Sequence, residues 1–191
     1  MTEIHTPPKI HTPPKRIMPY KKPDLVGGVN GDEFDDYSAF TGSGVDVNIS
    51  SVQVAHGGTY NGTLDRLYVT YEQLGPHLVW HGDSSGGTKS DPWTINILRG
   101  ERLVRIEVWH HVFSGIRELN GLRFTKSVPN KPDATSPILG ATTDSTYDGK
   151  TLDARGNGTI CCLWGKSGLF IDALGIWIRP PGRMMRLAEV Y

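Results

Sequence analysis

From residue 26 onward the chain is a series of short apolar segments, each interrupted after a few residues by Gly, Asn, Asp or Pro. Within the segments apolar and polar side chains alternate with a period of two, which predicts strands. The predicted strands are 45–51, 52–55, 64–71, 77–80, 93–98, 103–109, 116–125, 158–164 and 171–178. No segment carries a long apolar stripe of helical period, so very little helix is expected. Many short strands at regular spacing indicate an all-β sandwich, barrel or prism.

The first 24 residues differ in composition from the rest. They contain a tandem repeat, Ile4 to Lys9 followed by Ile10 to Lys15, whose Pro-Pro pairs fix φ and remove backbone donors. Residues 1–22 hold five basic residues and one acidic residue, a net charge of +4, so the remainder carries −4. We expect a disordered or extended Pro-rich arm, either a flexible tail or a segment that docks on a neighbouring subunit, an aromatic groove or an anionic surface.

Length and overall charge limit the remaining organisation. With 191 residues the chain is expected to form one domain, over residues 25–179, between the arm (1–24) and a C-terminal extension (180–191). The 20 basic and 20 acidic residues balance, which argues against nucleic acid as a partner. The sequence shows no signal peptide and no transmembrane segment, so we expect a leaderless, soluble protein, cytoplasmic or released without a signal peptide.

Cysteine and histidine usage argues against a metal site. The chain has only two cysteines, the adjacent Cys161 and Cys162, which excludes a disulfide-based fold and a four-thiolate zinc site. Adjacent side chains on a strand point to opposite faces, so His110 and His111 do not converge. His77 and His81 share a face but lie too far apart for a tight chelate. We therefore expect no metal and no cofactor.

Two glycine-rich segments are the main candidates for function. One is Gly27 to Asp36, with the sequence GGVNGDEFDD. The other is Gly165 to Ile176, with the sequence GKSGLFIDALGI, which presents one carboxylate, Asp172, at the start of an apolar strand. Exposed backbone N–H groups donate to oxygen atoms, and a fixed carboxylate accepts from two neighbouring hydroxyls at once. A ligand covered in hydroxyl groups, a sugar, fits this combination.

Taken together, these segments resemble the jacalin-related lectins over roughly Leu25 to Arg179. The resemblance is carried by five segments in the family's order: the first glycine loop running into Phe34-Asp35-Asp36, then LDRLYVTY (64–71), HGDSSGG (81–87), GLRFT (121–125) and the second glycine segment. It implies a β-prism I fold of three four-stranded antiparallel sheets. It also implies a lectin that binds carbohydrate without catalysis or metal.

The resemblance also implies roles for individual residues. Asp172 accepts hydrogen bonds from two adjacent sugar hydroxyls, and the backbone N–H groups of Leu169 and Phe170 hold the ring oxygen or a neighbouring hydroxyl. Gly31 offers its N–H from the other side. Gly31 and Gly168 are glycines because the chain turns sharply there and approaches the ligand. In the structural alternative, Asp172 caps its own turn and the glycines are ordinary hairpin residues.

A third wall of the site is expected from the loop 110–116, which matches the family's recognition loop. There His111 and Phe113 are expected to extend the contact to a second sugar residue. A galactose-preferring family member owes its preference to a free amino terminus, made by cleavage at the glycine that matches Gly31. Here the chain continues through Gly31, which favours mannose- or glucose-type glycans over galactose-type ones.

Two other functions were weighed against the lectin. A glycosidase needs two carboxylates flanking a bond, and Asp35 or Asp36 with Asp172 would supply them if the loops meet. We expect Asp35 and Asp36 to satisfy donors at the base of the loop instead, so no enzyme is predicted. The other alternative is a β-prism interaction or targeting module for an anionic polysaccharide, a membrane or a protein partner. A shallow sugar site binds weakly, so a multivalent homo-oligomer is expected.

Overall fold

The computed structural model describes residues 20–23, 25–40, 47–56, 63–72, 76–83, 93–113, 115–140 and 148–181. The principal strands are β1 (Val26–Gly27), β2 (Asp32–Asp35), β3 (Asn48–His56), β4 (Leu64–Glu72), β5 (Pro76–His81), β6 (Trp93–Asn96), β7 (Arg102–Phe113), β8 (Ile116–Ser127), β11 (Asp148–Asp153), β12 (Thr159–Ser167) and β13 (Ile171–Arg179). Two further strands are short, β9 (Ala134–Thr135) and β10 (Leu139–Gly140), and the helix α1 (Asp36–Phe40) has one turn. Most of the predicted arm (1–24) and of the predicted extension (180–191) lies outside these residues.

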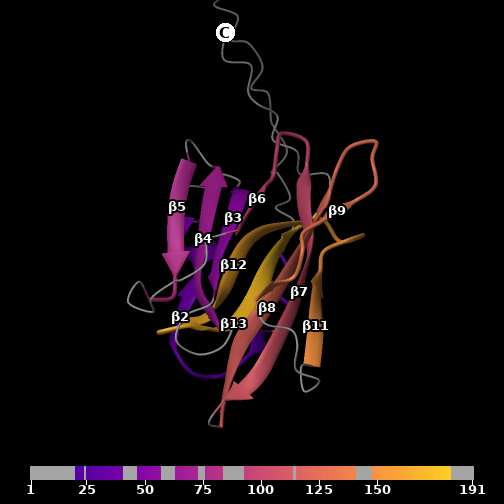
Figure 1. Ribbon diagram of the computed structural model, residues 1–191. Coiled ribbons are helices and arrows are strands. Elements are labelled where there is room, and N and C mark those ends of the chain that lie inside the picture. Colours follow the sequence, from indigo (N-terminus) through magenta and orange to yellow (C-terminus); the bar gives the residue numbers. More distant parts are fainter. Residues whose placement is uncertain are drawn as a thin grey trace, which may run out of the picture.

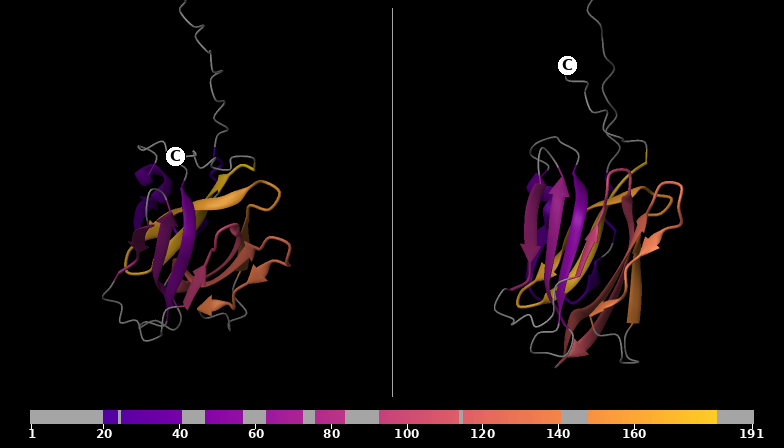
Figure 2. Two further views of the ribbon diagram at one scale, coloured as in Figure 1. Left: turned by 90° about the horizontal axis from the view of Figure 1, so that it is seen from above. Right: turned by 45° about the horizontal axis from the view of Figure 1, so that its top comes forward.

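The strands form three antiparallel sheets around a common interior (Figures 1 and 2). The first has the order β1-β13-β12-β2 and the second the order β5-β4-β3-β6. The third has the order β10-β8-β7-β11, and β9 also pairs with β8 as a fifth strand. The prediction of an all-β prism of three antiparallel sheets is confirmed.

The core is formed where the inward faces of the three sheets meet. Each sheet contributes side chains that are almost fully buried, for example Leu174 from the first sheet, Tyr71 from the second and Phe124 from the third. Burying an aliphatic or aromatic side chain of this size stabilises the fold by about 2 kcal/mol relative to leaving it in water. The fold is therefore held together by three apolar faces, without a disulfide between the buried Cys161 and Cys162.

The observed strands differ from the predicted ones in length and number. The predicted strands 45–51 and 52–55 are a single strand, β3, because a bulge between Ile49 and Ser51 shifts its register with β4 and interrupts the period of two. The two strands β7 and β8 are longer than predicted, and their hairpin reaches the lower end of the molecule in Figure 1. Two strands and a helix, β1, β2 and α1, form at and around the segment predicted as a glycine loop.

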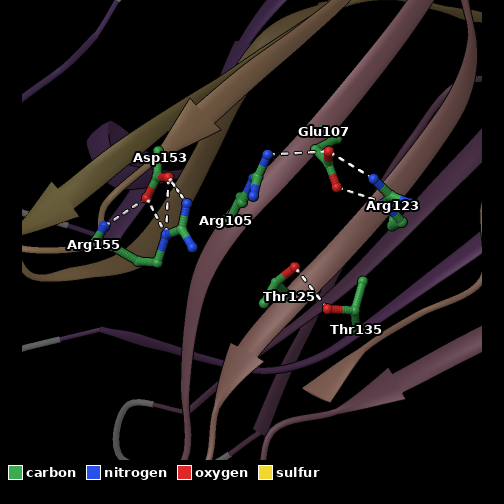
Figure 3. A network of polar contacts seen from close by, with 7 residues as sticks. All are labelled: Arg105, Glu107, Arg123, Thr125, Thr135, Asp153 and Arg155. Atoms are coloured by element: carbon green, nitrogen blue, oxygen red, sulfur yellow. Dashed lines mark hydrogen bonds and ion pairs between the residues drawn. The ribbon is translucent and has the colours of Figure 1, made fainter. Parts of the chain in front are cut away.

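One face of the third sheet carries a network of paired charges (Figure 3). Arg123 makes two hydrogen bonds to the carboxylate of Glu107, of 2.5 and 2.7 Å, and Arg105 adds a third of 3.1 Å. Nearby, the Arg155 Nε atom lies 2.9 and 3.1 Å from the two carboxylate oxygens of Asp153. The arginines in this network bind acids of the same sheet.

No helix among the described residues is long and apolar enough to cross a membrane.

Candidate functional site

Asp172 is the second residue of β13, directly after the turn 168–170 that joins β12 to β13. Its side chain is almost fully buried, with 6% exposure, and no hydrogen bond to its carboxylate is found among the described residues. The turn is closed by the backbone, because the Gly168 N–H donates to the carbonyl of Phe170 over 3.0 Å. Asp172 therefore does not cap this turn, and its carboxylate retains its capacity to accept hydrogen bonds.

Gly31 and Gly168 leave the space in front of this carboxylate clear. Gly31 has φ +75°, and a methyl group on its Cα would lie 2.5 Å from Oδ2 of Asp172. A methyl group on Gly168 would lie 3.8 Å from the Gly31 Cα and 4.0 Å from the same Oδ2. The two glycine segments thus meet at one carboxylate, although Gly31 and Gly168 are 137 residues apart in sequence, with Leu169 exposed beside it and Phe170 half-buried.

The backbone hydrogen bonds around the site fix the loop 28–31 against β13 and β12. The Gly28 N–H donates to the Asp172 carbonyl over 2.8 Å. On the other side the Lys166 ammonium donates to the carbonyl of Val29 over 3.1 Å. Burial raises the pKa of Asp172, and the positive charge of Lys166 opposes that rise. The site is therefore preformed, with one carboxylate whose charge is only partly compensated by the protein.

The β7–β8 hairpin, which contains the predicted recognition loop, lies beside this arrangement. A methyl group on Gly28 would meet the Arg117 carbonyl oxygen of β8 at 1.9 Å, so the two backbones are in close contact. His111 lies in β7 opposite Glu118, and Phe113 lies opposite Ile116. Both are on β7, the strand of this hairpin that pairs with β8, although the Phe113 side chain and Ser114 lie outside the described residues.

The sequence analysis missed Glu118 as a site residue. Its side chain is 6% exposed, and its Oε2 atom has no hydrogen-bond partner among the described residues. Burial and the nearby Asp172 carboxylate raise its pKa. An acidic residue among the first residues of a strand, directly after the recognition loop, was the signal that could have identified it.

Asp35 and Asp36, the acids weighed for a glycosidase, are engaged elsewhere. Asp35 accepts hydrogen bonds from the Lys22 ammonium and the Trp177 indole, both of 2.9 Å, and from the backbone N–H of Ser38 over 3.3 Å. Asp36 accepts a hydrogen bond from the Tyr71 hydroxyl and lies 3.0 Å from the His81 Nε2 atom. Both carboxylates thus bind protein donors at the base of the loop.

A separate cavity of about 140 Å³ lies next to the site on the first sheet. It is lined by Lys22, Leu25, Glu33, Phe34, Asp35, Trp164, Gly165 and Lys166. Lys22 lies in the described part of the arm, residues 20–23, and its ammonium lies 4.1 Å from the centre of the Trp164 ring. This cation–π contact and the ion pair with Asp35 attach the arm to the sheet. Within the described ranges no three His, Cys, Asp or Glu side chains gather as a metal site would require.

Known proteins are similar to this chain in sequence family and in fold. The family model of the jacalin-like lectin domain matches residues 24–177. Wild-type Malaysian banana lectin has a similar fold, with a TM-score of 0.64 and 24% identity over 85% of this chain and 99% of that one. A mannose-binding jacalin-related lectin from Ananas comosus has a TM-score of 0.63 and 20% identity, over 84% of this chain and 98% of that one. Single-chain recombinant jacalin has a TM-score of 0.65 and 20% identity, over 86% of this chain and 97% of that one. No curated protein sequence matches the chain.

Proposed function

The chain belongs to the jacalin-like lectin family, and from this premise we propose that it binds carbohydrate without catalysis, at the site formed by Asp172 and the two glycine segments. The resemblance drawn from the sequence is confirmed at the level of the family and the fold. The observation that carries the proposal is the Asp172 carboxylate, which is buried, bound by no side chain among the described residues, and faced by two glycines. Such a group is costly to bury unless a ligand supplies its hydrogen bonds.

Within this site the carboxylate accepts hydrogen bonds from two neighbouring hydroxyls of one sugar ring. The backbone N–H groups of Gly31, Leu169 and Phe170 donate to the ring oxygen or to a third hydroxyl. Exposed apolar side chains, Leu169 at 58% and Val29 at 82%, offer contact to the C–H groups of the ring. On the hairpin side, His111 and Phe113 extend the contact to a second sugar residue.

The preferred sugar in this proposal is mannose or glucose. The chain is continuous through Gly31, so no free amino terminus stands opposite Asp172. The similarity in fold to a lectin described as mannose-binding is consistent with this preference. Galactose-terminated glycans are the competing ligands, and the same experiment compares the two.

A glycan array tests the proposal with the wild type, Asp172→Ala and a control, Asp133→Ala. The control removes an equally charged but exposed carboxylate from the turn before β9. We expect mannose- or glucose-terminated glycans to bind the wild type and the control, and not Asp172→Ala. Preferential binding of galactosides would overturn the preference and leave the lectin in place. A folded wild type that binds no glycan would overturn the lectin and favour an interaction module.

Useful binding by a shallow site requires several sites on one particle, so we further propose that the protein is a homo-oligomer. Single-site affinity is expected between about 1 mM and 1 µM. The edge strand β5 supports association, because Leu78 and Trp80 on it are 64% and 57% exposed. Light scattering should show an oligomer that Trp80→Ser weakens. Leu98→Ser, at an apolar residue 63% exposed outside β5, serves as the control. A monomeric wild type would contradict this part of the proposal.

A further inference from the structure

Glu118 is a second buried acid at the edge of the same site. It lies on β8 opposite His111, with 6% exposure and an Oε2 atom that has no hydrogen-bond partner among the described residues. Taking a carboxylate out of water without a partner is strongly unfavourable, so such a group either holds a proton or binds a cation.

Gly28 is the link that places Glu118 next to Asp172. Its N–H donates to the carbonyl of Asp172 over 2.8 Å, and its Cα is in close contact with the carbonyl oxygen of Arg117. Glu118 follows Arg117 directly, so a single residue of the glycine loop separates the backbones of β8 and β13 here. The electrostatic effect is consistent with this, because the Asp172 carboxylate contributes to the raised pKa of Glu118.

Among the described residues, Lys166 and Arg117 form no ion pair with either of these two acids. Lys166 is the cation that acts on Asp172, but its ammonium donates to the Val29 carbonyl and lies 3.6 Å from Glu33. Arg117 is exposed, and no ion pair within the described part of the chain joins it to either acid. The histidines of β7, His110 and His111, are the other titratable groups on this side.

Asn120, two residues after Glu118 on β8, is a second observation that indicates a polar ligand. Asn120 is fully buried, and neither its side-chain oxygen nor its nitrogen has a hydrogen-bond partner among the described residues. It occupies the bulge at which β8 loses register with β7, between the pairs Gly121–Trp109 and Leu119–His110. Buried polar groups in native proteins are nearly always hydrogen-bonded. This part of the hairpin therefore holds buried polar groups that lack partners among the described residues.

We propose that Glu118 is a second carboxyl group of the sugar site, and that together with Asp172 it selects sugars that carry a protonated amino group. The inference rests on the proposed function of the Asp172 site. One carboxylate is sufficient for a pair of hydroxyls, whereas an ammonium offers three donors and a full positive charge to two acids. A partly buried site strengthens that attraction relative to water. Neutral sugars bind the same site without this contribution.

Titration calorimetry of the full-length protein near neutral pH tests the inference with three sugars: mannose, mannosamine and N-acetylmannosamine. Acetylation removes the charge and keeps the nitrogen, so the third sugar separates charge from shape. The variants are Glu118→Gln, which keeps the volume, and Glu72→Gln, which removes an exposed carboxylate at the end of β4, in the second sheet. Thermal unfolding of each variant checks that it is folded.

We expect the wild type and Glu72→Gln to bind mannosamine about tenfold more tightly than mannose, the size of one charge-assisted hydrogen bond. In Glu118→Gln this ratio should fall to about one while mannose binding persists. N-acetylmannosamine should show no gain in any variant.

Two results would overturn the inference alone: mannose binding without a preference for mannosamine in the wild type, or a preference that survives in Glu118→Gln. Binding of mannosamine but of no neutral sugar would instead contradict the proposed mannose or glucose preference. If the folded wild type binds none of these sugars, both proposals fail.

Discussion

Asp36 and Asp172 are both almost fully buried, at 3% and 6% exposure, but the protein treats the two carboxylates differently. Asp36 begins the helix α1 and is bound by Tyr71 of β4 and His81 of β5. The Tyr71 hydroxyl also accepts from the backbone N–H of Leu163 over 3.2 Å, which connects the second sheet to β12 of the first. Asp172 has no comparable donors among the described residues.

The difference shows how one kind of side chain serves the fold in one place and a ligand in another. Around Asp36 the neighbours are large: the Phe34 ring stacks on His81 with ring centres 3.6 Å apart. Burial and the Asp36 charge raise the pKa of Tyr71, which keeps its hydroxyl protonated as a donor. Around Asp172 the neighbours are Gly31 and Gly168, which contribute no side chain. A buried acid that is fully hydrogen-bonded stabilises the structure, and one without partners is available for recognition.

The largest effect in this comparison is expected at Asp36. In Asp36→Asn the negative charge is lost and one acceptor oxygen becomes an NH₂ donor, which disrupts a buried polar network that spans two sheets. We expect unfolding by urea to show a loss of about 3 kcal/mol in stability. Sugar affinity of the folded fraction should be unchanged. A variant as stable as the wild type would contradict the structural role assigned to Asp36.

The matched change at Asp172 should have the opposite pattern. Asp172→Asn removes an uncompensated buried charge, so stability at neutral pH should be equal to or higher than that of the wild type. Binding of mannose should weaken by about thirtyfold, or about 2 kcal/mol, because the amide accepts from fewer hydroxyls. Calorimetry and urea unfolding on the same preparations measure both quantities. A large loss of stability would place Asp172 with Asp36 as a structural residue.

These two acids also show where the sequence was informative and where it was not. The strand pattern was sufficient to predict an all-β fold, and the family resemblance, carried by short segments that include the two glycine segments, implied the prism and singled out Asp172. The partners of Asp36 could not be predicted, since Tyr71 and His81 are 35 and 45 residues away and meet it only through the arrangement of the sheets. Glu118 was missed although it directly follows the recognition loop, because its burial is set by tertiary packing that strand spacing does not show. Bulges, as in β3, also shift the period on which strand prediction relies.

The glycines near Asp172 give a smaller effect with a close control. Gly31 and Gly156 have φ values of +75° and +74°, so alanine at either position strains the backbone by about 1 kcal/mol. Only at Gly31 would the new methyl group lie 2.5 Å from Oδ2 of Asp172, whereas at Gly156 it meets nothing within 4 Å. We expect Gly31→Ala to weaken sugar binding about tenfold, or about 1.4 kcal/mol, and Gly156→Ala to leave it unchanged. Equal affinities would show that the space beside Asp172 is not used by the ligand.

The smallest expected effect is the pH dependence of stability, which separates the carboxyls by the direction of their pKa shifts. The pKa values of Asp172 and Glu118 are raised in the folded state above the ordinary values of 3.8 and 4.5, chiefly by burial. Protons therefore bind these two groups more tightly in the folded protein, so their contribution to stability is present below the ordinary values and is lost as the pH rises through the raised ones. Asp35 and Glu107, whose pKa values are lowered by Lys22 and Arg123 against the effect of burial, act in the opposite direction.

The difference in stability between a variant and the wild type removes the contributions of the carboxyl groups that the two proteins share. The stability of Glu118→Gln relative to the wild type should increase as the pH rises above the ordinary value of 4.5, because the glutamine avoids the charge that Glu118 acquires as the pH passes its raised pKa. Glu72→Gln, at an exposed position, should show no such trend. Urea unfolding at several pH values measures the difference, and a flat difference for Glu118→Gln would mean that Glu118 is solvated and does not share the buried site with Asp172. If the stability difference between Glu118→Gln and the wild type rises with pH, and this rise disappears when mannosamine is present, Glu118 and Asp172 bind one ligand. The bound ammonium would then stabilise the Glu118 charge, which otherwise has no partner in the wild type.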